Sequence, residues 1–534
     1  MRTSDIKKIK ETALGYIDAN KKRLSDFHQE IWNYAEPAFR EYKSAAAYVK
    51  LLRNEGFMVE EGSGGMPTAF KAVWGEGRPV LASYAEYDAV PGHSQKPVPY
   101  QAPRDGLHPM AAGHTDPHSS LGVGALFGVL AAKAAMEEHK LKGKLWFFGE
   151  PAEKVCGSKP VHAAKGYFDG MDAGLLYHPG ANSVRGEVQN GAYWNVVFQF
   201  ECVEPEEWYN LVGAEAYSRG GHSSGGRVPA ALDAVCMMYL TTKDVKEAML
   251  PHNAFWTLNE YILIGGQCTS DNLPPEISQI SYAYRTPELE MQEKITKILE
   301  NNARAVAKIC FCKVYERWVT KTRVGLGNMA MANLTYENFK LVGPPEYGED
   351  AKEFVRQIQK NIGLEPMTEP FTDDHKKITG PQEADARHRV RYPEIKNLGA
   401  DDYVDYTWHA PCARFMTARP VMKPLPDGRR YPSWARLAMG GNRSTIDPSI
   451  VVASKVIGAT FVDLLTKPGV LKEAWNEFNE RTGGGIGGSK WVAPLLPKAF
   501  DPPVELRWPE YITTARGEEW WIPTLKSTKE YRLL

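Results

Sequence analysis

Four short clusters of carboxylates and imidazoles in the first part of the chain could carry chemistry. They are Glu86-Tyr87-Asp88, His114-Thr115-Asp116-Pro117-His118, Glu150-Pro151-Ala152-Glu153 and His178-Pro179. Side chains of these types bind a divalent cation when they converge, and the cation then polarises a carbonyl group and activates water. A single His or Asp is more often a hydrogen-bonded loop residue, because ligation needs several partners. The clusters therefore predict a hydrolytic site if the fold brings them together.

The segments between these clusters predict an α/β domain. Short apolar runs at 80–84, 145–148 and 175–177 are typical of buried strands, and polar clusters follow them. Helical spacing is found at 24–34, 44–54 and 119–139, with Ser119 or Ser120 as the expected N-cap of the third helix. Because ligands bind at the carboxyl ends of strands in such sheets, we expect the clusters to meet there.

The pattern changes near residue 192. Residues 194–200 and 278–284 alternate between apolar and polar, whereas 230–240 and 290–308 have helical periodicity. These features predict a separate small α+β unit. Residues 349–396 are charged and weakly periodic, and an apolar helix at 450–465 is expected to complete the first domain.

Composition excludes several classes of protein. The 534 residues carry 64 Lys and Arg against 65 Asp and Glu, so no basic field is present to hold nucleic acid. No run is expected to span a membrane, and the N-terminal residues resemble no secretory signal. The seven cysteines form neither a disulfide framework nor a zinc ribbon. A cytoplasmic protein is expected, with no nucleic acid and no membrane as partners.

Taken in order, the clusters resemble the amidohydrolase and metallopeptidase family that contains aminoacylases, p-aminobenzoyl-glutamate hydrolases and glutamate carboxypeptidases. The most specific stretches are YDAVPG from Tyr87, FFGEPAEKVCGSK from Phe147, YHP from Tyr177 and DDYVDYTW from Asp401. The resemblance implies a zinc-peptidase-like catalytic domain, with a central sheet flanked by helices, interrupted by a ferredoxin-like α+β lid that also dimerises. The implied division is 1–189 and 306–493 for the catalytic domain, 190–305 for the lid, and 494–534 for a C-terminal tail.

The resemblance also implies a metal site that has degenerated. Relatives bind two metals through a Cys, a His, the second Glu of a pair, the His of a His-Pro turn and a late His. The corresponding positions here are Ala112, His114, Lys154, His178 and a residue at or beside Asp447. Alanine cannot bridge two cations, and the ammonium of Lys154 repels a metal that a carboxylate would hold.

Two arrangements remain open for this site. In one, His118 or Asp116 joins His114 and His178 to bind a single zinc or manganese ion. In the other, Lys154 replaces the charge of the metal, paired with Asp447 or Asp116, and the site works without metal. One ion is expected rather than two, with no ion as the alternative.

The resemblance assigns further residues to catalysis and to substrate. Glu153 matches the general base, and Asp88 matches the carboxylate that stands behind a metal-binding histidine. In the lid, His222 matches a histidine that reaches the site of the neighbouring protomer, and Asn272 and Arg285 match a pair that grips substrate. An arginine and a histidine can clamp a carboxylate and stabilise an oxyanion. The ligand is therefore expected to be a small anionic molecule.

The leading hypothesis is an amidohydrolase that cleaves the C–N bond of an N-acyl or N-aroyl amino acid, with Glu153 as general base. An aromatic substrate would suit the 14 Trp and 25 Tyr of the chain. One alternative is acyl transfer, condensation or a lyase reaction without metal, with Glu153 and Lys154 as acid and base. Another is a homodimer, joined through the lid, that only binds a ligand.

Overall fold

A computed structural model describes residues 3–115, 117–202, 230–251, 255–266 and 275–506, and the backbone of 511–514 and 517–520. The α-helices are α1 (Thr3–Ala19), α2 (Lys21–Tyr34), α3 (Tyr42–Asn54), α4 (His118–His139), α5 (Lys159–Ala164), α7 (Ala231–Met249), α8 (Leu289–Ile309), α9 (Met329–Val342), α10 (Glu349–Asn361), α11 (Pro381–Arg391), α12 (Ser433–Gly441), α13 (Arg443–Thr466) and α14 (Pro468–Thr482). The 3-10 helices are η1 (Ser63–Gly65), η2 (Glu153–Val155), η3 (Asp373–Lys376) and η4 (Asp402–Trp408). The strands are β1 (Met58–Glu61), β2 (Phe70–Glu76), β3 (Val80–Ala85), β4 (Gly143–Gly149), β5 (Ala173–Gly180), β6 (Ser183–Arg185), β7 (Ala192–Glu201), β8 (Thr257–Ile264), β9 (Ile277–Thr286), β10 (Lys313–Lys321), β11 (Cys412–Ala418), β12 (Tyr511–Thr514) and β13 (Gly517–Trp520).

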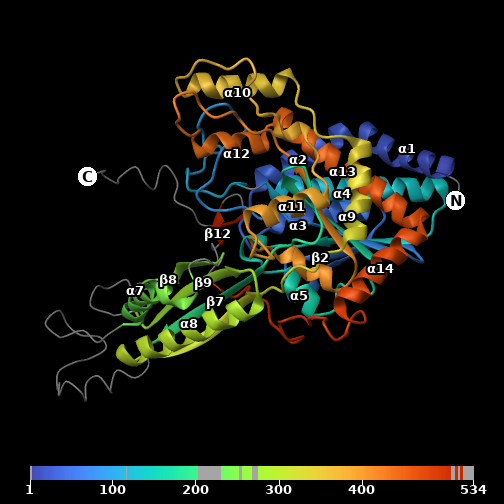
Figure 1. The fold of residues 1–534 in the computed structure, drawn as a ribbon. Coiled ribbons are helices and arrows are strands. Elements are labelled where there is room, and N and C mark those ends of the chain that lie inside the picture. The colour runs from blue at the N-terminus through green and yellow to red at the C-terminus, as the bar shows by residue number, and fades with distance from the viewer. Residues whose placement is uncertain are drawn as a thin grey trace, which may run out of the picture.

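A seven-stranded sheet forms the centre of the larger unit, with strand order β1-β2-β4-β3-β5-β11-β6. Strands β4, β3, β5 and β11 run parallel to one another, while β1, β2 and β6 are antiparallel to their neighbours. Strand β3 is buried along its whole length, as expected for a parallel strand covered on both faces. The carboxyl ends of the four parallel strands therefore lie at one edge, and the predicted α/β class with a central sheet and flanking helices is confirmed (Figure 1).

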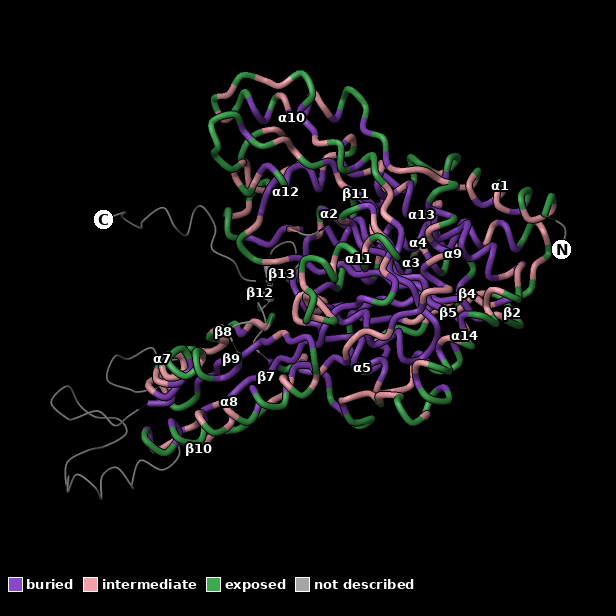
Figure 2. Tube along the Cα trace, viewed as in Figure 1, coloured by how far each residue is buried: buried purple, intermediate pink, exposed green. Residues whose placement is uncertain are grey.

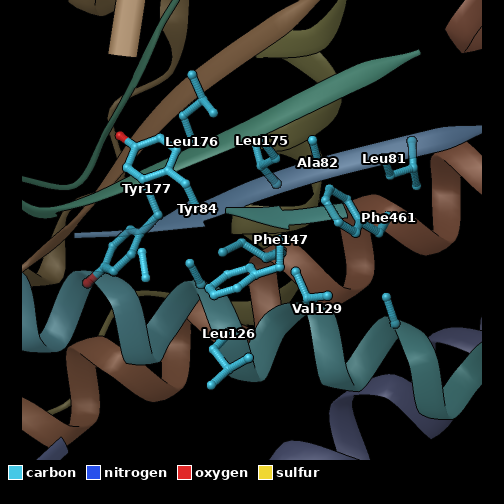
Figure 3. Close-up of a cluster of buried hydrophobic side chains, with 14 of the residues drawn as sticks. Leu81, Ala82, Tyr84, Leu126, Val129, Phe147, Leu175, Leu176, Tyr177 and Phe461 are labelled. Carbon is cyan, nitrogen blue, oxygen red and sulfur yellow. The ribbon is translucent and has the colours of Figure 1, made fainter. Parts of the chain in front are cut away.

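Helices α4 and α13 form the centre of the core beneath this sheet. Leu126 and Val129 of α4 and Phe461 of α13 lie among side chains from β3, β4 and β5 (Figure 3). Both helices are long and apolar enough to cross a membrane, contrary to the expectation from the sequence. Their apolar windows are 89% and 83% buried inside the protein, which is typical of core helices.

Glycines allow these two helices to approach closely. A Cβ atom added at Gly128 in α4 would lie 2.5 Å from Cβ of Ile457 and 3.0 Å from the carbonyl oxygen of Ser454, both in α13. No side chain larger than hydrogen fits at that separation without moving one helix. The same helix, α4, begins at His118, which lies at the edge of the sheet.

A second sheet belongs to a smaller unit. Its strand order is β10-β7-β9-β8, all antiparallel, and α7 and α8 complete a β-α-β-β-α-β chain order. This is the ferredoxin-like arrangement that the resemblance implied. Strand β10 pairs with β7, so the sheet includes residues beyond the proposed boundary at 305.

The region at 349–396 contains regular structure despite its weak periodicity. Helix α10 buries Phe354, Val355 and Ile358 against α12, and α11 follows. Figure 2 shows that burial is concentrated around the central sheet, whereas the outer turns of α10 and α8 are exposed. Ala351, Phe354, Val355 and Ile358 stand at the i, i+3, i+4 and i+7 spacing of an apolar helical stripe, so the weak periodicity expected for 349–396 was wrong for α10.

Substitution of Gly128 tests the close helix contact. We expect Gly128→Ala to lower the free energy of unfolding by about 1–3 kcal/mol, because overpacking displaces α13. The matched control is Gly15→Ala in α1, where an added Cβ meets nothing within 4 Å. That change should stabilise the helix by about 0.5–1 kcal/mol. Urea unfolding measures both, and equal stabilisation of the two variants would contradict the packing described for Gly128.

Candidate active site

Polar residues from several elements meet at the carboxyl edge of the parallel strands. Glu86 and Asp88 follow β3, Glu153 and Lys154 lie in η2 after β4, His178 lies near the end of β5, and His118 begins α4. Each strand is an apolar run that ends where the polar residues begin. The predicted convergence of Asp88, His118, Glu153 and His178 is therefore what the fold produces.

Asp88 connects two of the loops. It is fully buried, and its Oδ1 lies 2.6 Å from Nδ1 of His118. Its other oxygen, Oδ2, accepts a hydrogen bond of 2.8 Å from the backbone N–H of Lys154. Burial opposes ionisation of Asp88, but the positive charges of His118 and Lys154 outweigh burial and lower its pKa. An ionised Asp88 thus orients the His118 ring and the η2 turn together.

The other ring nitrogen of His118 faces the centre of the cluster. Its Nε2 lies 3.3 Å from Oε2 of Glu86, 3.2 Å from Oε2 of Glu153 and 2.9 Å from Nζ of Lys154. Burial and Lys154 both disfavour a charge on His118, but Glu86 and Asp88 outweigh them and raise its pKa to about 9. A proton on Nε2 would donate to a carboxylate, whereas the bare nitrogen accepts from the Lys154 ammonium.

Glu153 has the surroundings expected of a proton carrier. Its side chain is 12% exposed, and Oε2 lies 3.7 Å from Nζ of Lys154. Burial, followed by the neighbouring Glu86, raises the pKa of Glu153, although Lys154 and His118 act in the opposite direction. A raised pKa makes a carboxyl group a better proton donor and acceptor near neutral pH.

The backbone that presents Glu153 is held in an uncommon conformation. Ala152 and Cys156, on either side of η2, have φ angles of 56° and 51° in the left-handed region. The carboxylate of Glu41 accepts a 2.7 Å hydrogen bond from the backbone N–H of Ala152 and fixes one end of the turn. Burial and the nearby Asp88 raise the pKa of Glu41 to about 8.

Four further charged residues belong to this cluster and were not expected from the sequence. The Lys159 ammonium is fully buried and donates to Glu86 at 2.7 Å and to Asp402 at 2.6 Å. Beside it, Arg414 forms a 2.6 Å ion pair with Asp401. Lys159 closes the FFGEPAEKVCGSK stretch, and Asp401 and Asp402 open the DDYVDYTW stretch, whereas no quoted motif contains Arg414.

The donor set fits a divalent cation. Glu86, His118 and His178 each offer a ligand atom within 4.8 Å of the others, and Oε2 of Glu86 is buried without a hydrogen-bond partner in the described part of the chain. Two nitrogens and a carboxylate oxygen suit zinc or manganese. However, Nζ of Lys154 lies on the side of His118 Nε2 that a metal would approach. A cation can therefore bind His118 Nε2 only when the Lys154 side chain points away from it.

Two of the expected metal ligands lie apart from these groups. His114 is buried against Trp32, with ring centroids 5.4 Å apart, and burial lowers its pKa to about 3. Asp447 accepts a 2.5 Å hydrogen bond from Ser25, and burial raises its pKa to about 6. Neither belongs to a potential ligand group among the described residues. The resemblance had assigned the metal-binding role to His114, but the histidine that Asp88 backs is His118.

The ferredoxin-like unit reaches the cluster through its sheet. Tyr193 of β7 and Ala283 of β9 pack against Cys156 of the η2 turn. The guanidinium of Arg285 lies over the Tyr193 ring, 4.7 Å from its centroid. Burial raises the pKa of the Cys156 thiol, and the charge of Arg285 opposes that rise, so Arg285 lies near the turn that carries Glu153. His222, Asn272 and Asp116, the other expected site residues, lie outside the described residues.

Sequence comparison with curated proteins gives a consistent set of relatives. A p-aminobenzoyl-glutamate hydrolase chain from Escherichia coli (strain K12) is 26% identical over 484 residues, which cover 87% of this chain and 94% of that protein. The Xaa-Arg dipeptidase of Mus musculus is 25% identical over 361 residues, covering 65% and 75%. The N-acetyl-L-cysteine deacetylase of Bacillus subtilis (strain 168) is 28% identical over 163 residues, covering 29% and 36%.

No family model matches the chain. The three relatives are nevertheless hydrolases of amide or peptide C–N bonds. The resemblance to aminoacylase-like and p-aminobenzoyl-glutamate hydrolase-like amidohydrolases, predicted from the motifs, is confirmed.

Replacement of Lys159 tests the buried charge network. Lys159→Met leaves Glu86 and Asp402 buried without their shared cation, so the free energy of unfolding should fall by about 3–5 kcal/mol at pH 8. Uncompensated buried carboxylates have raised pKa values and stabilise the fold only where they are protonated. The loss should therefore be smaller at pH 5. Urea unfolding at both pH values measures this.

Lys352→Met is the control, because the Lys352–Glu369 pair of 2.8 Å involves a glutamate that is 57% exposed. Removing such a surface pair should change stability by less than about 1 kcal/mol. If the two variants lose the same stability, Lys159 does not hold the carboxylates in the way described.

Proposed function

We propose that this protein hydrolyses the amide C–N bond of a small N-acyl or N-aroyl amino acid, or of a similar amide. The observation that carries the proposal is the Glu153 carboxylate. It is largely buried, has a raised pKa, and lies 3.2 Å from Nε2 of a histidine that Asp88 orients. The amide hydrolases among the relatives support the same reaction class.

In this proposal Glu153 moves the protons. As the base it removes a proton from the attacking water, and as the acid it delivers that proton to the leaving nitrogen. Asp88 contributes indirectly, because it fixes the His118 ring and the turn that presents Glu153. The network of Lys159 with Glu86 and Asp402 keeps the carboxylates in place behind the reacting atoms.

We assign one zinc or manganese ion to Glu86, His118 and His178, rather than the pair of ions that relatives bind. Bound there, the ion would polarise the substrate carbonyl and lower the pKa of water. Ala112 offers no bridging ligand for a second ion. For one ion to bind His118, the Lys154 side chain must turn away from Nε2.

The lid residues supply the contacts to substrate in this proposal. Arg285 is near η2, and it would bind a carboxylate of the substrate through its guanidinium. We assign Asn272 and His222 to the same task from the resemblance, His222 acting on the site of a neighbouring protomer. The active form would then be a homodimer joined through the lid.

One observation favours a second candidate, metal-independent acyl transfer, condensation or lyase chemistry. Nζ of Lys154 lies 2.9 Å from His118 Nε2 and 3.7 Å from Glu153, so an ammonium is already available where positive charge is needed. In that case Lys154 and Glu153 would act as acid and base. The two candidates differ in whether the ammonium of Lys154 is required.

Glu153→Gln tests the role of the proposed base. The amide is nearly isosteric but cannot accept the proton, so kcat/KM for an N-acyl amino acid should fall about 100-fold or more. The control is Glu137→Gln, an exposed glutamate at the far end of α4 that pairs with Lys133. It should retain full activity. Activity of the Glu153 variant above about a tenth of wild type would remove Glu153 from this role.

Metal content of Lys154→Met separates the two candidates. Removing the ammonium beside His118 should tighten zinc or manganese binding by about tenfold or more, because like-charge repulsion is lost. Elemental analysis and metal titration measure this, with His118→Ala as the variant that should lose the ion. If wild-type protein is active without metal and Lys154→Met is inactive, the metal-independent candidate is correct instead.

A further inference from the structure

A cavity of about 880 Å³ lies beyond the ends of β5 and β11. Gly180 of β5 and Ala418 of β11 form its floor, and further walls come from η3, from residues 419–431 and from α12. Its volume is in the range that small-molecule sites occupy, about 300–1,000 Å³. The cavity adjoins the carboxyl edge of the sheet on which the catalytic cluster is built.

The charged residues that line the cavity are mostly cationic. Asp374 is the single carboxylate among the described lining residues. The cationic residues of the lining are Lys377, Arg387, Arg419, Arg429, Arg430 and Arg436. A concave surface of one sign concentrates the field inside it and attracts ligands of the opposite sign. The cavity is therefore built for an anion with more than one negative charge.

Only part of this positive charge is neutralised within the described chain. Arg387 pairs with Glu383, and Nε of Arg429 donates to Asp427 at 2.6 Å. Arg430 and Arg436 form no ion pair with any described residue. Guanidinium groups bind carboxylates and phosphates through two parallel N–H bonds, which suits these two residues to an anionic ligand.

A buried imidazole provides an independent sign of a polar ligand. His375 lines the cavity and is 7% exposed; the backbone of Thr372 interacts with its ring, while Nδ1 makes no hydrogen bond of good geometry to the described residues. The ring is fixed by Tyr347, at a centroid distance of 5.3 Å. Asn182 ties this wall to the floor, since it donates to the carbonyl oxygen of His375 at 2.7 Å and accepts from the backbone N–H of Ala418 at 2.8 Å. An unpaired buried nitrogen is costly unless a ligand or water satisfies it.

The cavity lies close to the catalytic cluster along one strand, and no residue of the cluster lines it. Gly180 follows His178 by two residues in β5, so both face the same side of the sheet, about 6–7 Å apart. The His178 ring in turn lies 5.9 Å from the ring of His118. This separation is within the length of a molecule of amino-acid size or larger.

We propose that this cavity binds the multiply charged end of the substrate, a group with two or more neighbouring carboxylates or a phosphoryl group. Arg430 and Arg436 supply the guanidinium forks, and His375 supplies a neutral hydrogen bond from the wall that η3 forms. The assignment to substrate rests on the proposed function, because it places the reacting amide at Glu153. Binding of an anion in the cavity does not depend on which reaction occurs there.

Direct binding to the full chain tests the cavity. Isothermal calorimetry with citrate, pyrophosphate and acetate should show that citrate or pyrophosphate binds and acetate does not, and the tighter of the two identifies the carboxylate or the phosphoryl class. The double variant Arg430→Ala, Arg436→Ala should weaken that binding at least tenfold. The matched control Arg53→Ala, Arg304→Ala removes two arginines on α3 and α8 that pair with Glu61 and Glu300. It should bind like wild type.

Absence of binding by both multivalent anions, or equal binding by the two double variants, would overturn the proposal.

Enzyme kinetics then test whether the anion that binds is part of the substrate. The Arg430→Ala, Arg436→Ala variant should raise KM at least tenfold with little change in kcat, and the bound anion should compete with substrate. An unchanged KM with intact anion binding would refute the assignment. Failure of the proposed function is a different result, since Glu153→Gln would then leave turnover unaffected while anion binding persists.

Discussion

The geometry of the site depends on Asp88, which holds two loops at once. One oxygen fixes the His118 ring and the other fixes the backbone of Lys154. His118 stands at the start of a core helix, whereas Lys154 stands in a strained turn after β4. Through these two hydrogen bonds, the single buried carboxylate of Asp88 holds the turn that carries Glu153 in a fixed position relative to the core helix. Without it, the positions of His118 and Glu153 would be set by independent loops.

Burying this many charges requires compensation inside the protein. Glu86, Asp88, Glu153, Asp401 and Asp402 face the cations of Lys154, Lys159 and Arg414, so the carboxylates outnumber the permanent cations in this cluster. Protons make up part of the difference, because burial raises the pKa of Asp402 well above its usual range. The lone pair of His118 Nε2 can hold a proton, accept a hydrogen bond from the Lys154 ammonium or bind a metal ion, but only one of these at a time.

The sequence predicted three of the seven strands of the central sheet, because each is a short but continuous apolar run followed by a polar cluster, and it predicted the main core helices from their helical spacing. Strands β3, β4 and β5 and helix α13 contain the expected segments. Spacing alone did not show where α4 begins: the expected N-cap was Ser119 or Ser120, yet the helix starts at His118. That shift, of less than one helical turn, places His118 in the helix and beside Asp88. Lys159 and Asp402 both stand in motif stretches, but their pairing could not be foreseen, because the two residues lie 243 positions apart in the chain.

The way the ferredoxin-like unit is inserted limits how it can move. It enters through β7 and leaves through β10, which are neighbours in its sheet, and Lys321 at its exit pairs with Trp194 at its entrance. The strand by which the chain enters this unit and the strand by which it leaves are thus paired by backbone hydrogen bonds. The two chain connections between the units therefore lie side by side, and packing of Tyr193 and Ala283 on Cys156 adds a second contact between the units. Arg285 pairs with Tyr193 of β7, so its guanidinium is held beside this paired connection rather than at the far end of the unit.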